Sequence, residues 1–279
     1  MAAAQFEEMP TMMDYSAYDE LKVDRPEDGI LRVSFNRPDR MNALTSETHR
    51  QLGDIWRDID RDDTVRAVLL CGEGDHFCAG GEFDLVENLI HDHDLRMRNF
   101  REARDLVYNM INCSKPIVSA MQGGCAGGGL AAGLLADISI VTRKAKLVDG
   151  HVRLGVAAGD HAVLLWPLMC GLAKAKYHLL LNEPLTGERA EEIGLVSLAV
   201  EDHELREKAM EVTRRLAAGA PSAVRWTKYA LNNWLRAAGP TFDNSLAREF
   251  MGFSGPEVRE GVAAIKEKRK PDFPGNSRI

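Results

Sequence analysis

The sequence lacks the features that mark several large classes of protein. No apolar run reaches the roughly 18 residues that a membrane-spanning helix needs, so we expect no transmembrane segment. The opening twenty residues contain no basic segment followed by an apolar stretch, and we therefore expect no secretory signal. Positive charge is in deficit: the formal net charge is −7 and the pI is near 5.7, which leaves no electrostatic footprint for nucleic acid. We expect a cytoplasmic protein that binds neither a membrane nor nucleic acid.

Cysteine is scarce and odd in number. The five cysteines have spacings that fit neither a disulfide framework nor a zinc site. We therefore expect buried, reduced thiols and no bound metal. The chain also has no internal repeat and no low-complexity tract.

What is present indicates a globular α/β protein. The 279 residues are 45% apolar and 28% charged, which is ordinary for a globular chain long enough for one large domain. Segments with strand patterns alternate with segments of helical periodicity, which is typical of an α/β core with crossover connections. The expected strands are 29–36, 65–73, 115–123 and 138–143, and the expected helices in this half are 45–63, 82–112 and 130–137.

The second half of the chain changes character. From about residue 172 it becomes mostly helical, with several amphipathic segments. We expect a flexible leader over 1–18, a core over 19–205 and a C-terminal helical region over 206–279. These last helices are too few to fold alone, so they should dock on the core or on a neighbouring subunit.

Two glycine-rich turns each follow an expected strand and precede an expected helix. They are "HFCAGGEFDLV" (76–86) and "GGCAGGGLAAG" (123–133). A helix N-terminus has unpaired N–H groups, and two such turns side by side can direct two of them at one oxygen, forming an oxyanion hole. The alternative is that the glycines only allow helix and strand to pack closely. The dinucleotide-binding G-x-G-x-x-G spacing is absent.

These residues resemble the crotonase, or enoyl-CoA hydratase/isomerase, superfamily over about residues 20–275. The resemblance is carried by five segments in the same order: "NRPDRMNAL" (36–44), "HFCAGGEFDL" (76–85), "KPIVSAMQGGCAGGGLAAGLLADISI" (115–140), "LTGERAEEIGLVSLAV" (185–200) and "EGVAAIKEKRKPDF" (260–273). It implies a β-β-α spiral core and a C-terminal region that forms a homotrimer or a dimer of trimers. It also implies a coenzyme A thioester as substrate, with no permanently bound cofactor.

The resemblance assigns roles to single residues. The two amides that hold the thioester oxygen fall on Gly81 and Gly128. Contacts to the coenzyme fall on Arg40, Cys78, Ala79 and Lys268, of which Arg40 and Lys268 would meet its phosphates. A solvated basic helix end is the alternative for Lys268.

The two glutamates that hydratases of this family use are absent. The first should lie three residues after the middle glycine of the triplet, where this chain has Ala131; the second falls on His151. The segment 149–167 offers other ionisable groups, including Asp149, Asp160 and His161. A histidine of near-neutral pKa is a competent general base, so His151 and Asp160 are the expected proton-handling pair. The alternatives are a packed surface histidine and a helix-capping aspartate.

A narrower resemblance concerns the same residues. The pattern His–x8–Asp followed by "WP" resembles the carbon–carbon bond hydrolase branch of the superfamily, typified by 6-oxocamphor hydrolase. That likeness implies His151, Asp160 and Glu249 as cooperating residues, with His49 as a further histidine. The alternative for His49 is an exposed helix residue.

Three hypotheses about function remain open at this level. The first is an enoyl-CoA hydratase-like lyase with unusual acid–base residues, and the second is a hydrolase that cleaves a β-diketone or a β-ketoacyl-CoA. The third, prompted by Ala131, is a non-catalytic protein that binds acyl-CoA. Among the remaining residues, His91 and His93 are interpreted as a solvated face and Trp166 as core. Trp226, Trp234 and Phe250 either pack among the C-terminal helices or line the acyl end.

Overall fold

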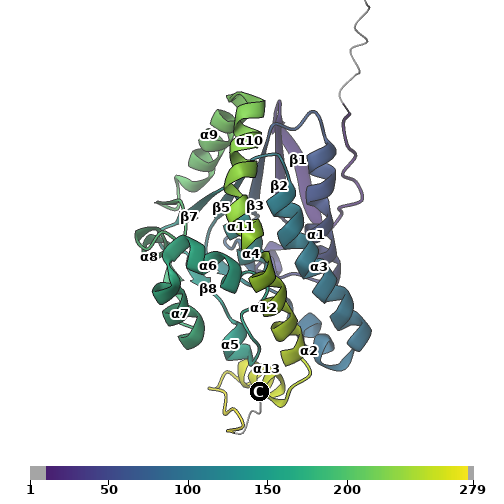
Figure 1. Cartoon of the computed structure of the whole chain (residues 1–279), viewed down its shortest axis with the longest axis vertical. Helices are drawn as coiled ribbons and strands as arrows, with labels where there is room; N and C mark the ends of the chain where they lie inside the picture. The colour runs from purple at the N-terminus through teal and green to yellow at the C-terminus, as the bar shows by residue number, and fades with distance from the viewer. Residues whose placement is uncertain (1–10, 276–279) are drawn as a thin grey trace, which may run out of the picture.

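A six-stranded sheet forms the centre of the computed structural model, which describes residues 11–275 (Figure 1). The first two strands pair antiparallel, and every later neighbour pairs parallel. In spatial order, the strands are β1 (Leu21–Glu27), β2 (Ile30–Phe35), β3 (Ala67–Gly72), β5 (Ile117–Met121), β7 (Ile138–Thr142) and β10 (Leu198–Val200).

A second, smaller sheet is built from short strands that follow the long ones. Its order is β4 (Cys78–Ala79), β6 (Gly124–Ala126), β8 (Lys146–Val148) and β9 (Leu185–Thr186). The chain therefore repeats one unit: a strand of the large sheet, a strand of the small sheet, then a helix. This repetition is the expected β-β-α spiral, and the predicted fold class is confirmed.

Fourteen helical segments surround the two sheets in the described part of the chain. In order they are η1 (Pro38–Arg40), α1 (Ser46–Arg61), α2 (Phe83–His91), α3 (His93–Asn112), α4 (Gly127–Leu135), α5 (His151–Leu154), α6 (Ala162–Cys170), α7 (Leu172–Leu181), α8 (Gly187–Glu192), α9 (Leu205–Ala218), α10 (Pro221–Leu231), α11 (Asn233–Ala237), α12 (Gly239–Gly252) and α13 (Pro256–Lys266). No helix of residues 11–275 is both long enough and apolar enough to cross a bilayer.

Helices cover both faces of the large sheet, which explains its continuous apolar strands. In β3, Val68 and Leu70 belong to the main core, whereas Leu69 and Cys71 pack under α9. A parallel strand covered on both faces reads as an unbroken apolar run instead of an alternating one.

The helix expected over 82–112 is two helices, which corrects the sequence-based assignment. Asp92 ends α2, and its side chain accepts a hydrogen bond from the amide of Leu95 at the start of α3. A side-chain cap of this kind favours a new helix start over continuation of the old one. The flanking His91 and His93 are exposed, as interpreted from the sequence.

The C-terminal helices pack on the core of the same chain. Helix α9 covers β3 and β5, α12 packs against α3 and α6, and α13 packs against α2 and α5. Of the expected leader, residues 1–10 lie outside the described part. Residues 11–18 contact α1, with Tyr15 bonded to Asp62 and Tyr18 bonded to Asp58.

Candidate active site

Two adjacent turns bring the glycines of the expected oxyanion hole together. One turn joins β4 to α2 and the other joins β6 to α4, and β4 and β6 are paired in parallel. Gly80 and Gly127 both have positive φ, and a side chain at Gly127 would come within 2.9 Å of the Gly80 Cα. Only glycine fits at these two positions without strain. The close approach of the turns depends on it.

The amides of Gly81 and Gly128 have no partner among residues 11–275. Leu44 forms a single parallel bridge with Gly81 in which the Leu44 amide donates to Gly80 and the Glu82 amide donates to Leu44. The Gly81 N–H is left out of this bridge. Gly128 is the second residue of α4, where an amide has no acceptor one turn earlier in the helix.

Both glycines line one cavity of about 290 Å³. Its opposite wall is mostly apolar and comes from α2, α12 and the segment after α12, with Leu85, Val86, Phe250 and Phe253. The polar side chains on the cavity are His49, Asn99, His151, Asp160 and Glu249. The residues that the sequence singled out for chemistry therefore meet in one place.

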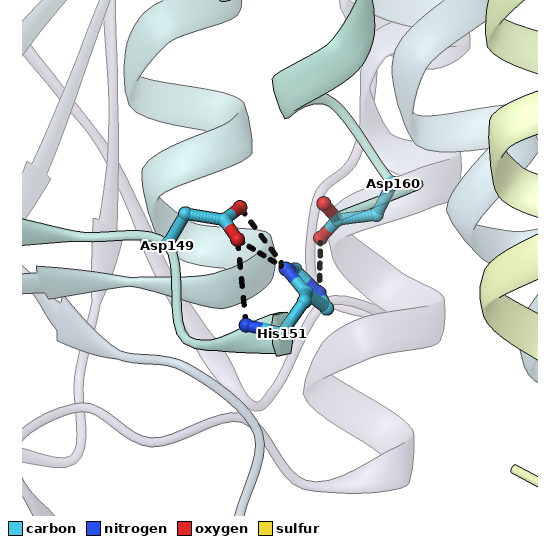
Figure 2. Close-up of side chains that lie close together, drawn as sticks. All are labelled: Asp149, His151 and Asp160. Atoms are coloured by element: carbon cyan, nitrogen blue, oxygen red, sulfur yellow. Dashed lines mark hydrogen bonds and ion pairs between the residues drawn. The ribbon is translucent and has the colours of Figure 1, made fainter. Parts of the chain in front are cut away.

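His151 is surrounded by carboxyl groups (Figure 2). It begins α5, and its Nδ1 lies 3.0 and 3.1 Å from the two carboxylate oxygens of Asp149. Its Nε2 lies 3.7 Å from an oxygen of Asp160 and 3.6 Å from an oxygen of Glu249. Asp160 precedes α6 and Glu249 comes from α12, so three separate parts of the chain build this cluster.

Burial and charge change the proton affinity of the cluster. Burial alone would lower the pKa of His151, but the carboxylates of Asp149, Asp160 and Glu249 outweigh it and hold that pKa well above its usual value. Burial raises the pKa of Glu249 to about 8, against the opposing effect of His151. Burial also opposes ionisation of Asp160, but His161 and His151 hold its pKa below the usual range. His151 and Glu249 therefore carry protons at neutral pH, and Asp160 is ionised.

A second histidine–carboxylate pair lies on the α1–α3 wall of the cavity. His49 Nδ1 is 2.9 Å from Glu102, which also accepts a hydrogen bond of 3.1 Å from Asn99. His49 is buried, which excludes the alternative of an exposed helix residue. The sequence analysis missed Glu102 and Asn99. Their spacing of three residues on one helix face was the available signal.

The spacing of donor atoms in this cluster would by itself permit a bound metal ion. Donor atoms of Asp149, His151 and Asp160 lie within 4.8 Å of one another. The Nδ1 of His151 is already at hydrogen-bond distance from Asp149, however. The arrangement is that of a hydrogen-bonded acid–base cluster.

The alternative of a capping role for Asp160 does not hold. The N-cap of α6 is His161, and no side chain caps this helix. The carboxylate of Asp160 is bonded instead to His161 Nδ1 at 2.6 Å. Asp149 was noted in the sequence without a role. In the structure it is the nearest partner of His151.

The expected coenzyme contacts divide into three cases. Ala79 lines the cavity, whereas the Cys78 side chain is fully buried, and a Cβ on Gly129 would come within 2.2 Å of its Cβ. The Cys78 side chain fills the space beside the glycine triplet, and a contact of its backbone to the coenzyme stays a prediction. Arg40 in η1 and Lys268 after α13 are exposed and lie outside the cavity lining. Their contacts to coenzyme phosphates stay predictions.

The aromatic residues named from the sequence differ in burial and in whether they line the cavity. Phe250 lines the cavity and Trp166 is buried in the core. Trp226 and Trp234 do neither, because they are 74% and 72% exposed. Ala131 is buried inside α4 and offers no proton-handling group.

The fold and the cavity define an α/β protein in which two glycine turns and a buried histidine–carboxylate cluster line one cavity. Residues 25–276 match the family described as enoyl-CoA hydratase/isomerase. This chain belongs to that family and so to the crotonase superfamily of enzymes.

Individual relatives differ in the reactions that their names state. The 1,2-epoxyphenylacetyl-CoA isomerase of Escherichia coli is 34% identical over 255 residues, covering 89% of this chain and 96% of the relative. A crystal structure of an enoyl-CoA hydratase/isomerase from Mycobacterium paratuberculosis has a TM-score of 0.83 at 32% identity, covering 88% of this chain and 97% of the other. A β-diketone hydrolase from the cyanobacterium Anabaena has a TM-score of 0.78 at 29% identity, covering 86% and 96%. The chain is therefore similar to isomerases, hydratases and a hydrolase at comparable levels.

Proposed function

We propose that this protein processes acyl-CoA thioesters and adds water to an α,β-unsaturated acyl group. One observation carries the proposal: the unpaired Gly81 and Gly128 amides and the His151 cluster line the same cavity. Two preorganised donors aimed at a developing oxyanion lower the barrier by several kcal/mol, about 2.7–4 for each donor. The family description supports a thioester carbonyl as the group they hold.

The charges of Asp160, His151 and Glu249 suggest how the protons move. Asp160 is ionised, so it accepts a proton from the water whose oxygen bonds to the β-carbon of the acyl group. The electron pair of the double bond moves to the thioester oxygen, which the amides of Gly81 and Gly128 stabilise as an enolate. The enolate then takes a proton at its α-carbon from protonated Glu249 or His151. The proposal thus reverses the sequence-based role of His151, from base to acid.

Crotonyl-CoA tests this function through loss of its conjugated thioester absorbance. We expect turnover by the unmodified chain and a loss of about 10²–10⁴ in kcat for Asp160→Asn and for His151→Gln. His91→Ala, on the exposed end of α2, is the matched control and should keep the original rate. Equal rates in all four proteins would remove the cluster from the mechanism.

Hydrolytic cleavage of a carbon–carbon bond is the second candidate. The gathering of His151, Asp160 and Glu249 supports it, together with the similarity to a β-diketone hydrolase. Water would attack a ketone carbonyl, the bond to the α-carbon would break, and its electron pair would form an enolate held by the glycine amides. Protonation of that α-carbon completes the reaction.

A substrate panel separates the candidates by their products. Enoyl thioesters that give 3-hydroxyacyl thioesters support hydration, and a shifted double bond or a rearranged epoxide supports isomerisation. Cyclic β-diketones or β-ketoacyl thioesters that give carboxylic acids support hydrolysis. Tight coenzyme A binding without turnover on the whole panel would instead identify a non-catalytic acyl-CoA-binding protein.

A further inference from the structure

His161 is a buried titratable residue that the proton transfers above do not use. It directly follows Asp160 and its side chain has no exposed surface. Its Nδ1 lies 2.6 Å from Asp160 Oδ1, closer than any contact of His151 to its three carboxyl partners. Such a short contact between a buried imidazole and a buried carboxylate is a strong, charge-assisted hydrogen bond.

The side chain of His161 has no other task in the local structure. Its backbone carbonyl accepts hydrogen bonds from Leu164 and Leu165 at the start of α6, but its imidazole does not cap that helix. Its Nε2 is buried and finds no acceptor or donor among the described residues. The imidazole therefore has a single polar contact, and that contact is Asp160.

This pattern fixes where the histidine carries its hydrogen. An ionised carboxylate only accepts, so Nδ1 must be the donor, and a hydrogen on the partnerless Nε2 would be a buried, unsatisfied donor. The Nδ1–H tautomer is the one that satisfies both conditions. With Oδ1 of Asp160 held in this way, Oδ2 is the oxygen that lies toward His151, 3.7 Å from its Nε2.

We propose that His161 is a positioning residue. As the Nδ1–H tautomer it holds Oδ1 of Asp160 by a hydrogen bond, and this directs Oδ2 of Asp160 at the reacting atoms. Each cavity-facing group of the cluster then has a buried partner: Asp149 for His151, and His161 for Asp160. The catalytic consequence rests on the proposed function, whereas the tautomer and the contact do not.

Removal of His161 should change the acidity of Asp160 in a known direction. The titratable groups facing Asp160 are His161 from its own loop, His151 from α5, Glu249 from α12 and, farther away, His49 from α1. Loss of the His161 hydrogen bond removes one of the contacts that favour the ionised carboxylate. The pKa of Asp160 should rise, and the acidic limb of the pH–rate profile should move to higher pH.

The tautomer is tested without any substrate. In histidine-labelled full-length protein, nitrogen-15 NMR distinguishes a protonated Nδ1 from a protonated Nε2, and His161→Asn assigns the signal. We expect a hydrogen on Nδ1, donated to Asp160 Oδ1, and none on the partnerless Nε2. The opposite tautomer would overturn the proposal whether or not the protein turns over any thioester.

Kinetics test the positioning role with two variants. His161→Phe keeps the ring shape and removes the donor, whereas the amide of His161→Asn can replace the Nδ1–H. We expect His161→Phe to lower kcat by about tenfold or more with little change in KM. It should also move the acidic limb of the pH–rate profile to higher pH. His161→Asn should recover most of the rate and return the limb toward its original position.

A second buried histidine provides the matched control. His178 in α7 is buried, contacts the Glu183 carbonyl through Nδ1 and does not line the cavity. His178→Asn should leave the pH profile in place. The proposal is overturned if His161→Phe and His161→Asn lose equal activity, or if activity falls while the acidic limb stays where it was. If His161→Phe does not fold, the limb position in His161→Asn and the NMR tautomer still decide.

Discussion

Glu249 is a buried carboxylic acid whose proton is held by its surroundings. Its carboxyl has one oxygen with no hydrogen-bond partner in the described residues and another 3.6 Å from His151 Nε2. Burial raises its pKa to about 8, so it is largely neutral at pH 7 and can donate a proton there. Activity that needs this acid should fall as pH rises through about 8.

Glu249→Gln tests both the acid and its cost to the fold. The pKa of Glu249 in the folded protein is raised from the model-compound value of 4.5. Its contribution to the free energy of unfolding is therefore complete below pH 4.5 and is lost as pH rises through about 8. We expect the glutamine variant to gain stability over the original chain on the order of a few kcal/mol above pH 8, and almost none at pH 5. Thermal melts at the two pH values measure this, and kcat should fall without an alkaline limb near 8. A gain that is larger at pH 5 would contradict the assigned charge state.

Asp149 determines how strongly His151 holds its proton. Among the charges that raise the pKa of His151, that of Asp149 has the largest effect, and its carboxylate accepts from Nδ1 at 3.0 Å. Asp149→Asn keeps the shape and removes the charge, so the pKa of His151 should fall toward its ordinary value. NMR titration of the His151 ring proton measures it. An unchanged midpoint would show that Asp160 and Glu249 alone hold the proton.

At the scale of elements, the site depends on how closely α12 approaches the loop before α6. Gly159 permits this contact, because a Cβ there would lie 2.3 Å from the Ser245 carbonyl and 2.7 Å from the Glu249 Cβ. The Ser245 hydroxyl also donates to the Gly159 carbonyl at 2.9 Å. This contact sets the separation of Asp160 from Glu249.

Gly159→Ala should therefore damage stability and activity together. We expect a loss of about 1–3 kcal/mol from overpacking, with a lower kcat because α12 must move away from His151. Gly150→Ala is the control for stability, since a Cβ there meets nothing within 4 Å. Chemical denaturation of both variants gives the comparison. Equal stability of the two would mean that the helix adapts without strain.

At the scale of the whole molecule, an apolar surface on α10 and α11 has no cover within the described chain. Trp226, Tyr229, Leu231 and Trp234 are each more than 60% exposed, and the two helices lie on the outside of the fold (Figure 1). Exposed aromatic clusters of this kind mark protein interfaces. We propose that this surface is buried between copies of the chain, in the trimer or dimer of trimers that the family resemblance implies.

Light scattering coupled to gel filtration tests the assembly. The unmodified chain should have a mass of three or six copies, and Trp226→Glu combined with Trp234→Glu should reduce it, because each charge would be buried in the interface. Glu207→Lys on the exposed side of α9 is the control and should leave the mass unchanged. A single-copy mass for the unmodified chain would disprove the proposal.

Much of the architecture follows from local patterns in the sequence. The helical spacing over 45–63, the apolar run of β3 and the two glycine turns each predict their element, because an amphipathic helix, a buried strand and a tight turn depend on neighbouring residues. The break at Asp92 was missed, since charged residues flank it on both sides and the helical pattern gives no sign of the interruption.

The sequence by itself determined the α/β class and the glycine turns, since these depend on residue type and on short spacing along the chain, and the family resemblance indicated four of the five polar cavity residues. Only the tertiary structure decided which partner each ionisable group has. Glu102 reaches His49 across 53 positions, and no sequence pattern indicated this pair. Partnership and burial set the pKa values and the tautomers, and both arise from packing between distant segments that no local pattern specifies.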